Sequence, residues 1–574
     1  MLSRLDWVET DLIWTMEIIY GGETYRFANI PMDLVDGNTS YPYMGGLEDV
    51  SIESTMERVG NVSSQSNSIS IAIRFPHRNI AQDVMNGKIL EGSTAEIGFV
   101  LSRKGEIITP WDEKPTVFRG EITSPVYGHP NQSVGYVEFS IENPALISEQ
   151  GLLSSIIGKN MYIEDVSCSN ALYVSPEWPQ DAGLTEVQDI HRGKTIPWVF
   201  GDLGALRRSN NNQISIPISP CYCIAYDPAT TGKPVYYIIA GHATNATTVK
   251  AFSNTGETQD GVSVSTFINI DGRVLSYIAI LQSSSIPQSV AAGDDRQVWI
   301  EWDDGDPYPN PLGNGDGLRG GGDICLWMLQ QITDDIDFDA WNALRPFLNQ
   351  YEFAGWVNDP KITIIQWLNK NIISYLPISV VNGGNGLKPI LDMFVSHVST
   401  GERLNIISGP EWFRAGPITT ETNPEDIINN VTVRYGKNGV NGTYSVFVQC
   451  GHEVPAMGTL SSQSYTANPK SLISVQRYGV KSRVVELDYC YSMDTAQRVA
   501  NDIIERDSIP IRSIQYSVSS RYGYLNIGDI VSITDEDIGL DDHRSQILSK
   551  VWEEGRWALT LRLDDNPLTY TRKN

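Results

Sequence analysis

Alternation of apolar and polar residues dominates the first 152 residues of the chain. Ile69, Ile71 and Ile73 alternate with small or charged residues, which is the period of two that a strand with one buried face requires. Apolar and β-branched residues at 12–20 and 24–28 flank two glycines, a pair that tight hairpin turns favour, so 12–29 predicts a hairpin. Further predicted elements are strands at 95–102, 116–123 and 136–141 and a short helix at 80–85. We expect a compact β domain over 1–152.

A helical period stands out near the other end of the chain. Ser492 is a suitable N-cap, and Ala496, Val499 and Ile503 recur at the spacing of one apolar helix face. The pattern predicts a helix over 493–506, which Pro510 ends. Predicted strands follow at 513–519, 527–533, 546–551 and 557–563, with turns at Gly528-Asp529 and Glu554-Gly555. We expect a C-terminal domain at 427–574 in which this one helix packs on a small antiparallel sheet.

The central region changes character at about residue 318. Short strands broken by Gly, Asn and Pro are predicted before it, at 235–240, 248–252, 274–281 and 298–302. Apolar residues at helical spacing follow at 323–331, 338–349 and 362–371, and the glycine-rich stretch 383–386 predicts a turn. The fold class is therefore mainly β with α+β parts and multidomain: two terminal β domains, an inserted β domain at 153–317, and an α+β domain with several helices at 318–426.

Charge and length narrow the function classes. The chain has 574 residues, which is enough for several domains, and a net charge of −27. The sequence has no cluster of Lys and Arg, which proteins that bind the phosphates of nucleic acid require, so this class of function is disfavoured. The excess of carboxylates serves either solubility or a role inside an assembly, and both interpretations stay open. The start has no signal-peptide core and no apolar run reaches a membrane span, so we expect a protein made and assembled in the cytoplasm.

Candidate chemistry is sparse. The six cysteines, at 168, 221, 223, 325, 450 and 490, lack zinc spacing, and Cys221 and Cys223 are expected to be buried free thiols. Gly193-Lys194-Thr195 is not a phosphate loop, because Gln188 stands where a glycine is required and Pro197 falls in the expected helix.

No hydrolase constellation is visible either. The sequence has no Gly-x-Ser-x-Gly elbow and no His-Glu-x-x-His, and His242 and His452 are expected to be structural residues at strand ends. The acidic stretches 303–306 and 314–317 are expected to be solvated loops, since they lack the ligand spacing of a calcium site. We predict no catalytic, cofactor-binding or metal-binding residue, no cofactor, and no enzyme.

The order of elements resembles a known family. Thr-Ala-Gln-Arg-Val-Ala-Asn-Asp-Ile-Ile-Glu-Arg at 495–506, a strand, Leu-Asn-Ile-Gly-Asp-Ile-Val-Ser-Ile at 525–533 and a closing hairpin resemble the C-terminal part of the baseplate hub, or tail-tip, proteins of tailed bacteriophages. Val-Phe-Arg-Gly-Glu-Ile at 117–122 occupies the matching place in the first hub domain. Residues 193–201 and 321–329 resemble the start of the second domain and the first helix of lambda-like tip attachment proteins.

The resemblance implies both architecture and role. It implies two hub-type β-barrel domains, at 1–152 and 427–574, and a homotrimer that places six barrels in a ring. It also implies a structural virion protein at the distal end of the tail, which joins the tail tube or a distal tail protein to spike or fibre proteins and neighbours the tape measure protein. DNA would pass through its channel without specific binding. Carboxylates lining that channel would repel DNA, and the 535–542 and 303–306 loops are candidates.

A second hypothesis is a carbohydrate-binding or glycan-cleaving receptor-recognition module. The 14 Trp and 26 Tyr supply rings that stack on sugars. They are scattered singly through predicted strands, where core packing is the default use of an aromatic residue. The hub is therefore favoured, and a receptor-binding insertion would lie in 200–300, where the resemblance is loosest.

Overall fold

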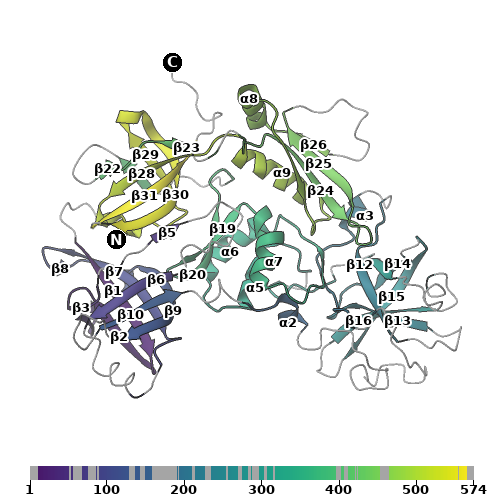
Figure 1. Ribbon diagram of the computed structural model, residues 1–574, viewed down its shortest axis with the longest axis horizontal. Helices are drawn as coiled ribbons and strands as arrows, with labels where there is room; N and C mark the ends of the chain where they lie inside the picture. Colours follow the sequence, from purple (N-terminus) through teal and green to yellow (C-terminus); the bar gives the residue numbers. More distant parts are fainter. Residues whose placement is uncertain are drawn as a thin grey trace.

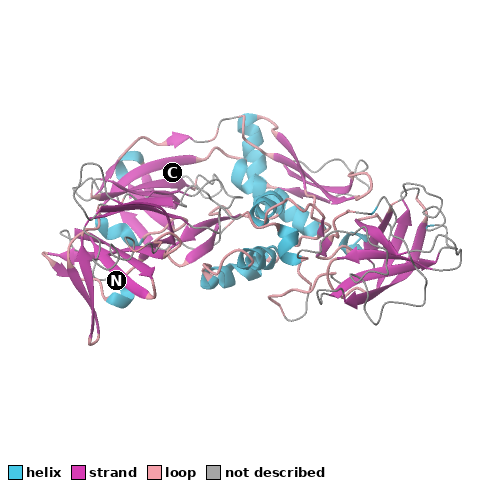
Figure 2. Ribbon diagram, turned by 60° about the horizontal axis from the view of Figure 1, so that its bottom comes forward, coloured by secondary structure: helices cyan, strands magenta, loops and turns pink. Residues whose placement is uncertain are grey.

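The computed structural model describes residues 11–48, 50, 53–55, 68–74, 86, 89–127, 136–142, 149–157, 191, 193–209, 214–225, 234–253, 256–268, 274–281, 286, 297–302, 307–313, 317–395, 402–405, 412–420, 422, 425–452, 464–553 and 555–564. The first and last parts of the chain lie together at one end, a barrel from its middle lies at the other, and helices lie between them (Figure 1). Figure 2 shows the same elongated arrangement, with the helices gathered centrally between groups of strands.

The N-terminal sheet closes into a barrel. Its long strands follow the order β2, β1, β7, β9, β10, β6, and all neighbours in this order are antiparallel. Residues 46–48 join the two ends of the sheet, because Leu47 N–H donates to Ala28 O (3.1 Å) and Glu48 N–H donates to Ala72 O (3.0 Å). A Cβ at Gly46 would lie 2.0 Å from Arg74 O, so glycine is required at this closure. The elements are β1 (Asp11–Tyr20), β2 (Glu23–Ala28), β3 (Met32–Asp36), β4 (Thr39–Gly45), β6 (Ser68–Arg74), β7 (Thr94–Arg103), β8 (Glu106–Ile107), η2 (Trp111–Glu113), β9 (Thr116–Tyr127) and β10 (Tyr136–Glu142).

The C-terminal sheet is completed by a strand from the N-terminal region. Its main order is β21, β29, β30, β31, β28, β22, and β5 (Glu53–Thr55) pairs antiparallel with β30. The two sheets face one hydrophobic core, in which Trp14 and Phe99 of the barrel contact Trp557 of β31. The elements are β21 (Glu402–Asn405), β22 (Trp412–Arg414), β23 (Thr419–Thr420), β28 (Arg512–Val518), η7 (Ser520–Tyr524), β29 (Ile530–Asp535), η8 (Glu536–Ile538), β30 (Leu540–Glu553) and β31 (Arg556–Leu563).

The inserted β region is a closed six-stranded barrel in the order β12, β13, β16, β15, β14, β17. Its strands are β12 (Ser219–Ala225), β13 (Pro234–Ala240), β14 (Thr248–Ser253), β15 (Thr258–Ile268), β16 (Val274–Leu281) and β17 (Val298–Trp302). Trp302 and Tyr237 are among its fully buried side chains. All four strands predicted in this stretch are present.

The helical region packs against that barrel. Asp337 caps α6, since its carboxylate accepts a hydrogen bond from Ala340 N–H (3.0 Å), and Thr363 with Gln366 forms a capping box at the start of α7. The 383–386 stretch is the predicted turn between β19 and β20. The elements are α2 (Leu152–Ile156), β11 (Trp198–Phe200), α3 (Ala205–Ser209), α5 (Gly321–Gln330), α6 (Phe338–Leu348), β18 (Gly355–Val357), α7 (Ile364–Asn371), η6 (Ile373–Tyr375), β19 (Ile378–Gly383) and β20 (Gly386–Leu391).

The predicted C-terminal helix is present, but its packing partner was predicted wrongly. α9 (Met493–Asp507) packs on β24 and β25 of a separate four-stranded sheet, and the strands that follow it form the C-terminal sheet described above. A second helix, α8 (Pro469–Tyr478), corrects the expectation of one helix over 427–574. The strands of this sheet are β24 (Asn430–Lys437), β25 (Tyr444–Gly451), β26 (Ser464–Ala467) and β27 (Ser482–Glu486). An amphipathic helix reveals that it has an apolar face and not which sheet covers that face.

The structure confirms a mainly β, multidomain fold. Among the described residues, β21 and β22 at the two ends of the C-terminal sheet do not pair with each other, and the inserted region is a closed barrel. The predicted helix at 80–85 lies outside the described residues. The limits of the four domains stay predictions. Within the described ranges, no helix combines the length and apolar character needed to span a bilayer.

Candidate functional site

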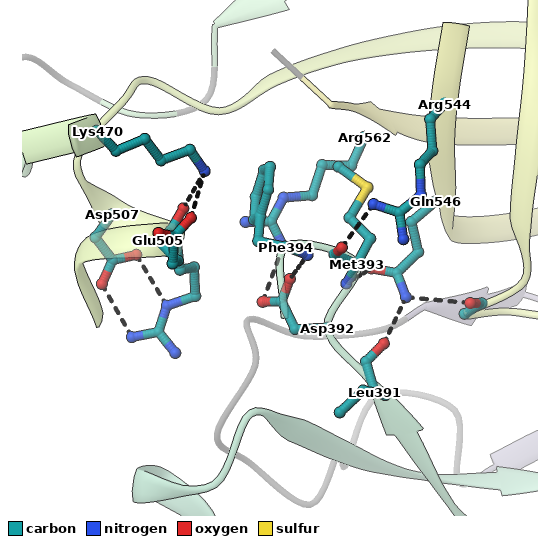
Figure 3. A network of polar contacts seen from close by, with 12 residues as sticks. Leu391, Asp392, Met393, Phe394, Lys470, Glu505, Asp507, Arg544, Gln546 and Arg562 are labelled. Carbon is teal, nitrogen blue, oxygen red and sulfur yellow. Dashed lines mark hydrogen bonds and ion pairs between the residues drawn. The ribbon is translucent and has the colours of Figure 1, made fainter. Parts of the chain in front are cut away.

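The described residues form two large hydrophobic cores, and a polar joint connects them. One core unites the inserted barrel, the helices α5 to α7 and the sheet under α9. The other unites the N-terminal barrel with the C-terminal sheet. Residues 391–394, which begin with the last residue of β20, lie between β30 and β31 on one side and the α8 and α9 region on the other (Figure 3). This short segment is the centre of the joint.

Asp392 and Arg562 form a buried ion pair across the joint. The Asp392 carboxylate accepts a hydrogen bond from Phe394 N–H (2.9 Å) and lies 3.4 Å from Arg562 Nη1. The two side chains are 1% and 5% exposed, so neither charge has water as an alternative partner. Loss of either member would leave the other charge buried and uncompensated, which costs roughly 3–5 kcal/mol.

The Phe394 ring lies near two cations, one from β31 and one from α8. The Arg562 guanidinium is 4.2 Å from the ring centroid, and the Lys470 ammonium of α8 is 4.7 Å from it. Lys470 also donates to Glu505 O (2.7 Å) and pairs with the Glu505 carboxylate (3.3 Å), which ties α8 to α9. Desolvated contacts of this cation–π type contribute about 2 kcal/mol each.

Side chains of the C-terminal sheet satisfy the backbone of the same segment. Gln546 Nε2 donates to Leu391 O (3.0 Å), and its Oε1 accepts from Met393 N–H (3.3 Å). Arg544 Nη1 donates to Met393 O (2.8 Å). These three bonds tie the segment to β30 and leave its paired backbone groups without need of water.

The contact between the N-terminal barrel and the C-terminal sheet contains a buried lysine. The Lys550 ammonium lies 4.0 Å from the Trp557 ring centroid and donates to the carbonyls of Gly523 and Leu525, the latter at 2.7 Å. A Cβ on Gly523 would lie 2.6 Å from Phe99, so η7 packs directly on the barrel. Burial lowers the pKa of Lys550 to about 7, and the Asp529 carboxylate opposes that shift.

The charged groups of the joint contact one another, backbone carbonyls or an aromatic ring. Its cations are paired with carboxylates, carbonyls or aromatic rings, and it contains no nucleophile beside a base. In the part of the chain that the structure describes, no group of three or more His, Cys, Asp or Glu side chains could hold a metal ion.

The two histidines singled out in the sequence both lie at strand ends. His242, two residues after the end of β13, accepts a hydrogen bond from Val199 N–H at Nε2 (3.3 Å), and its Nδ1 contacts Ala243 O (2.7 Å). Burial lowers the pKa of His242 to about 4, so the neutral ring serves as a bridge between strands. His452 follows β25 directly and is half-buried.

The other motifs fall as follows. Cys221 and Cys223 in β12 are buried free thiols, as predicted. The cysteines at 325, 450 and 490 are also buried and free, and residue 168 lies outside the described residues. Gly193-Lys194-Thr195 is followed by the strand β11 instead of the helix that a phosphate loop needs. Residues 303–306 and 314–316 also lie outside the described residues.

The acidic 535–542 stretch is more structural than expected. Asp535 is buried and accepts a hydrogen bond from the Tyr516 hydroxyl (2.9 Å), and Asp542 accepts one from Ser532. Because the Asp535 carboxylate is buried, it cannot line a channel, which corrects the expectation for this residue. Glu536, Asp537, Asp541 and Asp542 are exposed.

Sequence reasoning missed the joint entirely. Asp392, Lys470 and Arg562 are single charged residues far apart in the chain, and none belongs to a motif. The only usable hint was the charged Arg562 inside an otherwise apolar predicted strand, since a charge on a buried face needs a partner.

Part of the chain matches a known protein family. Residues 460–549 match the model of a family described as "Putative phage tail protein". This stretch is similar to that phage tail protein family. The matched range contains α8, α9, β28 and β29 and includes Lys470, Glu505 and Gln546 of the joint. No curated protein matches the sequence.

Several solved structures of tail proteins are similar over most of the chain. The tail protein from Neisseria meningitidis is 10% identical over 96% of this chain and 97% of that one, with a TM-score of 0.33. The 43 kDa tail protein of prophage MuSo2 from Shewanella oneidensis is 9% identical over 97% and 98%, with a TM-score of 0.31. A chain in the virion of a native gene transfer agent particle is 8% identical over 71% and 91%, with a TM-score of 0.40.

Proposed function

We propose that this chain is a structural protein of a phage tail and, within the tail, the hub of the tip or baseplate. The observation that carries the proposal is the match of residues 460–549 to a phage tail protein family, in a stretch that contributes to both cores and to their joint. A hub transmits load between neighbours, and a buried ion pair with satisfied backbone bonds around it suits a part that must keep its shape.

In this proposal the protein is a homotrimer at the distal end of the tail, assembled in the host cytoplasm. It joins the tail tube or a distal tail protein to spike or fibre proteins, contacts the tape measure protein, and surrounds part of the DNA channel. The net charge of −27 suits a channel that must not retain DNA. We propose no catalytic activity.

The test is the mass and shape of the full chain, alone and mixed with its tail tube protein. Light scattering is expected to give three times 63.7 kDa, and negative-stain images are expected to show a three-fold ring with a central hole. A chain that stays monomeric in the presence of the tube protein would contradict the hub. A trimer without a hole would contradict the channel.

A further inference from the structure

A cleft unrelated to the joint lies where the helical region meets the sheet under α9. An inner pocket of about 270 Å³ is lined by residues of β18, α7 and the segment 488–491. It adjoins an outer hollow of about 710 Å³ lined by residues of β24, β25 and β27. Lys370, Lys437 and Asp488 line both hollows, so the two lie side by side. The inner one is near the lower limit of small-molecule sites and the outer one lies within their range.

Four aromatic side chains line the inner pocket, and two of them, Trp356 and Tyr489, are only half-buried. Trp356 is half-buried and contacts Trp299 of the inserted barrel edge-on, with ring centroids 6.0 Å apart. Tyr489 is also half-buried, and its ring stacks near Phe200, with centroids 6.0 Å apart and planes 24° apart. A Cβ at Gly355 would lie 2.3 Å from the Tyr489 ring, so this arrangement depends on glycine. Rings already held in place lose little conformational entropy when a ligand binds.

The outer hollow adds two more half-buried rings and a balanced set of charges. Tyr375 and Tyr444 contribute to its lining. Across both hollows the charged groups are three cations and three carboxylates: Lys370, Arg434, Lys437, Asp359, Glu486 and Asp488.

These charges cancel locally as well as in number. Lys437 lies 2.9 Å from the Asp488 carboxylate, and Arg434 lies 3.3 Å from the Glu486 carboxylate. A cleft with no surplus charge gives no electrostatic reason to bind a phosphate, an acidic peptide or a cation. It does offer many hydrogen-bond donors and acceptors beside flat apolar rings.

We infer that this cleft binds a neutral saccharide chain. A sugar ring has an apolar face of C–H groups, which suits Trp356 and Tyr489, and a rim of hydroxyl groups, which suits Asn358, Asp359 and Lys370. The inner pocket takes one terminal sugar unit and the outer hollow takes the units that follow. The site goes beyond the hub role, because a hub needs no ligand to join its neighbours.

The test uses the full chain and two neutral tetrasaccharides, cellotetraose and chitotetraose, as probes in saturation-transfer NMR. Transfer from the protein to at least one probe is expected, and Trp356→Ala is expected to weaken that binding by about tenfold or more. Trp111→Ala is the matched control, because Trp111 is half-buried and stacks on Tyr41 in the N-terminal barrel, away from the cleft. That variant is expected to bind like the parent.

Stability has to be separated from binding. If Trp356→Ala lowers the melting temperature, the exposed Lys370→Ala replaces it as the cleft variant and is expected to weaken binding by a few-fold. Absence of transfer to both probes would overturn the inference. Binding that both cleft variants leave unchanged, or that inorganic phosphate displaces, would overturn it too, since the ligand would then sit elsewhere or be recognised by charge.

Discussion

At the residue scale, the buried pair Asp392 and Arg562 is expected to dominate the stability of the joint. Asp392→Asn leaves the Arg562 charge buried, so the free energy of unfolding should fall by about 3 kcal/mol or more. The measurement is denaturant unfolding followed by tryptophan fluorescence. Adding Arg562→Met to that variant should restore part of the loss, because the uncompensated charge is then removed.

A matched exposed pair separates burial from the charge contact itself. Arg434 and Glu486 are 3.3 Å apart, close to the 3.4 Å of the buried pair, but are about half exposed. Glu486→Gln should therefore change stability by less than about 1 kcal/mol. If Asp392→Asn and Glu486→Gln lowered the free energy of unfolding equally, the buried pair would contribute no more to stability than an exposed one.

His242 gives the chain an acid-sensitive position. Burial lowers its pKa to about 4, whereas the unfolded chain binds the same proton near 6.5, so this contribution to stability is complete above pH 6.5 and is lost as pH falls toward 4. When the pH is lowered from 7 to 4.5, the free energy of unfolding of the parent should fall by about 2 kcal/mol more than that of His242→Gln, because glutamine does not titrate. Asp502, whose pKa burial raises to about 7, acts in the opposite direction, so only the difference between the two proteins is informative. A difference that does not vary with pH would refute the assignment.

At the element scale, α9 shows what local pattern can predict and where it fails. Its limits follow from the Ser492 cap, which accepts a hydrogen bond from Thr495 N–H (3.4 Å), and from the spacing of its apolar face. Its partner sheet could not be predicted, because the pairing of β24 with β27 and of β30 with β5 is set by residues distant in sequence. α8 was predictable in principle, since Asn468 caps it and Pro469 occupies its first turn.

The apolar face of α9 can be tested directly. Ile503 is 8% exposed, and Ile503→Asp should lower the free energy of unfolding by about 3 kcal/mol or more, because it places a charge in the core. Arg498→Asp introduces the same side chain at an exposed position of the same helix and should cost about 1 kcal/mol or less. Thermal melts of the two variants decide the matter: similar melting temperatures would mean that the described helix register is wrong.

At the scale of the whole molecule, the chain's two ends fold as one body. Trp14 of β1 contacts both Trp552 and Trp557, with each pair of ring centroids 5.9 Å apart, and β5 adds a strand to the C-terminal sheet. The sequence pattern predicted strands in the N-terminal barrel and in the C-terminal sheet but not the shared core between them. Alternation shows that one face of a strand is buried and does not show what covers that face. The same limit hid the joint, whose partners come from three separate parts of the chain.

The arrangement in two hydrophobic cores predicts which strands lose protection from hydrogen exchange together. Trp557→Ala removes a fully buried ring from the core shared by the N-terminal barrel and the C-terminal sheet, which should lower the free energy of unfolding by about 3–5 kcal/mol. Backbone amides in β1 and β7 should then exchange hydrogen faster, and so should those in β28 and β31. Trp302→Ala removes an equally buried ring from the inserted barrel and should raise exchange in β12 to β17 while leaving β1 unchanged. Hydrogen exchange read by mass spectrometry measures both patterns in the full chain. If Trp557→Ala affected only the C-terminal sheet, the N-terminal barrel would be an independent unit, and the two ends of the chain would be held together by surface contact alone.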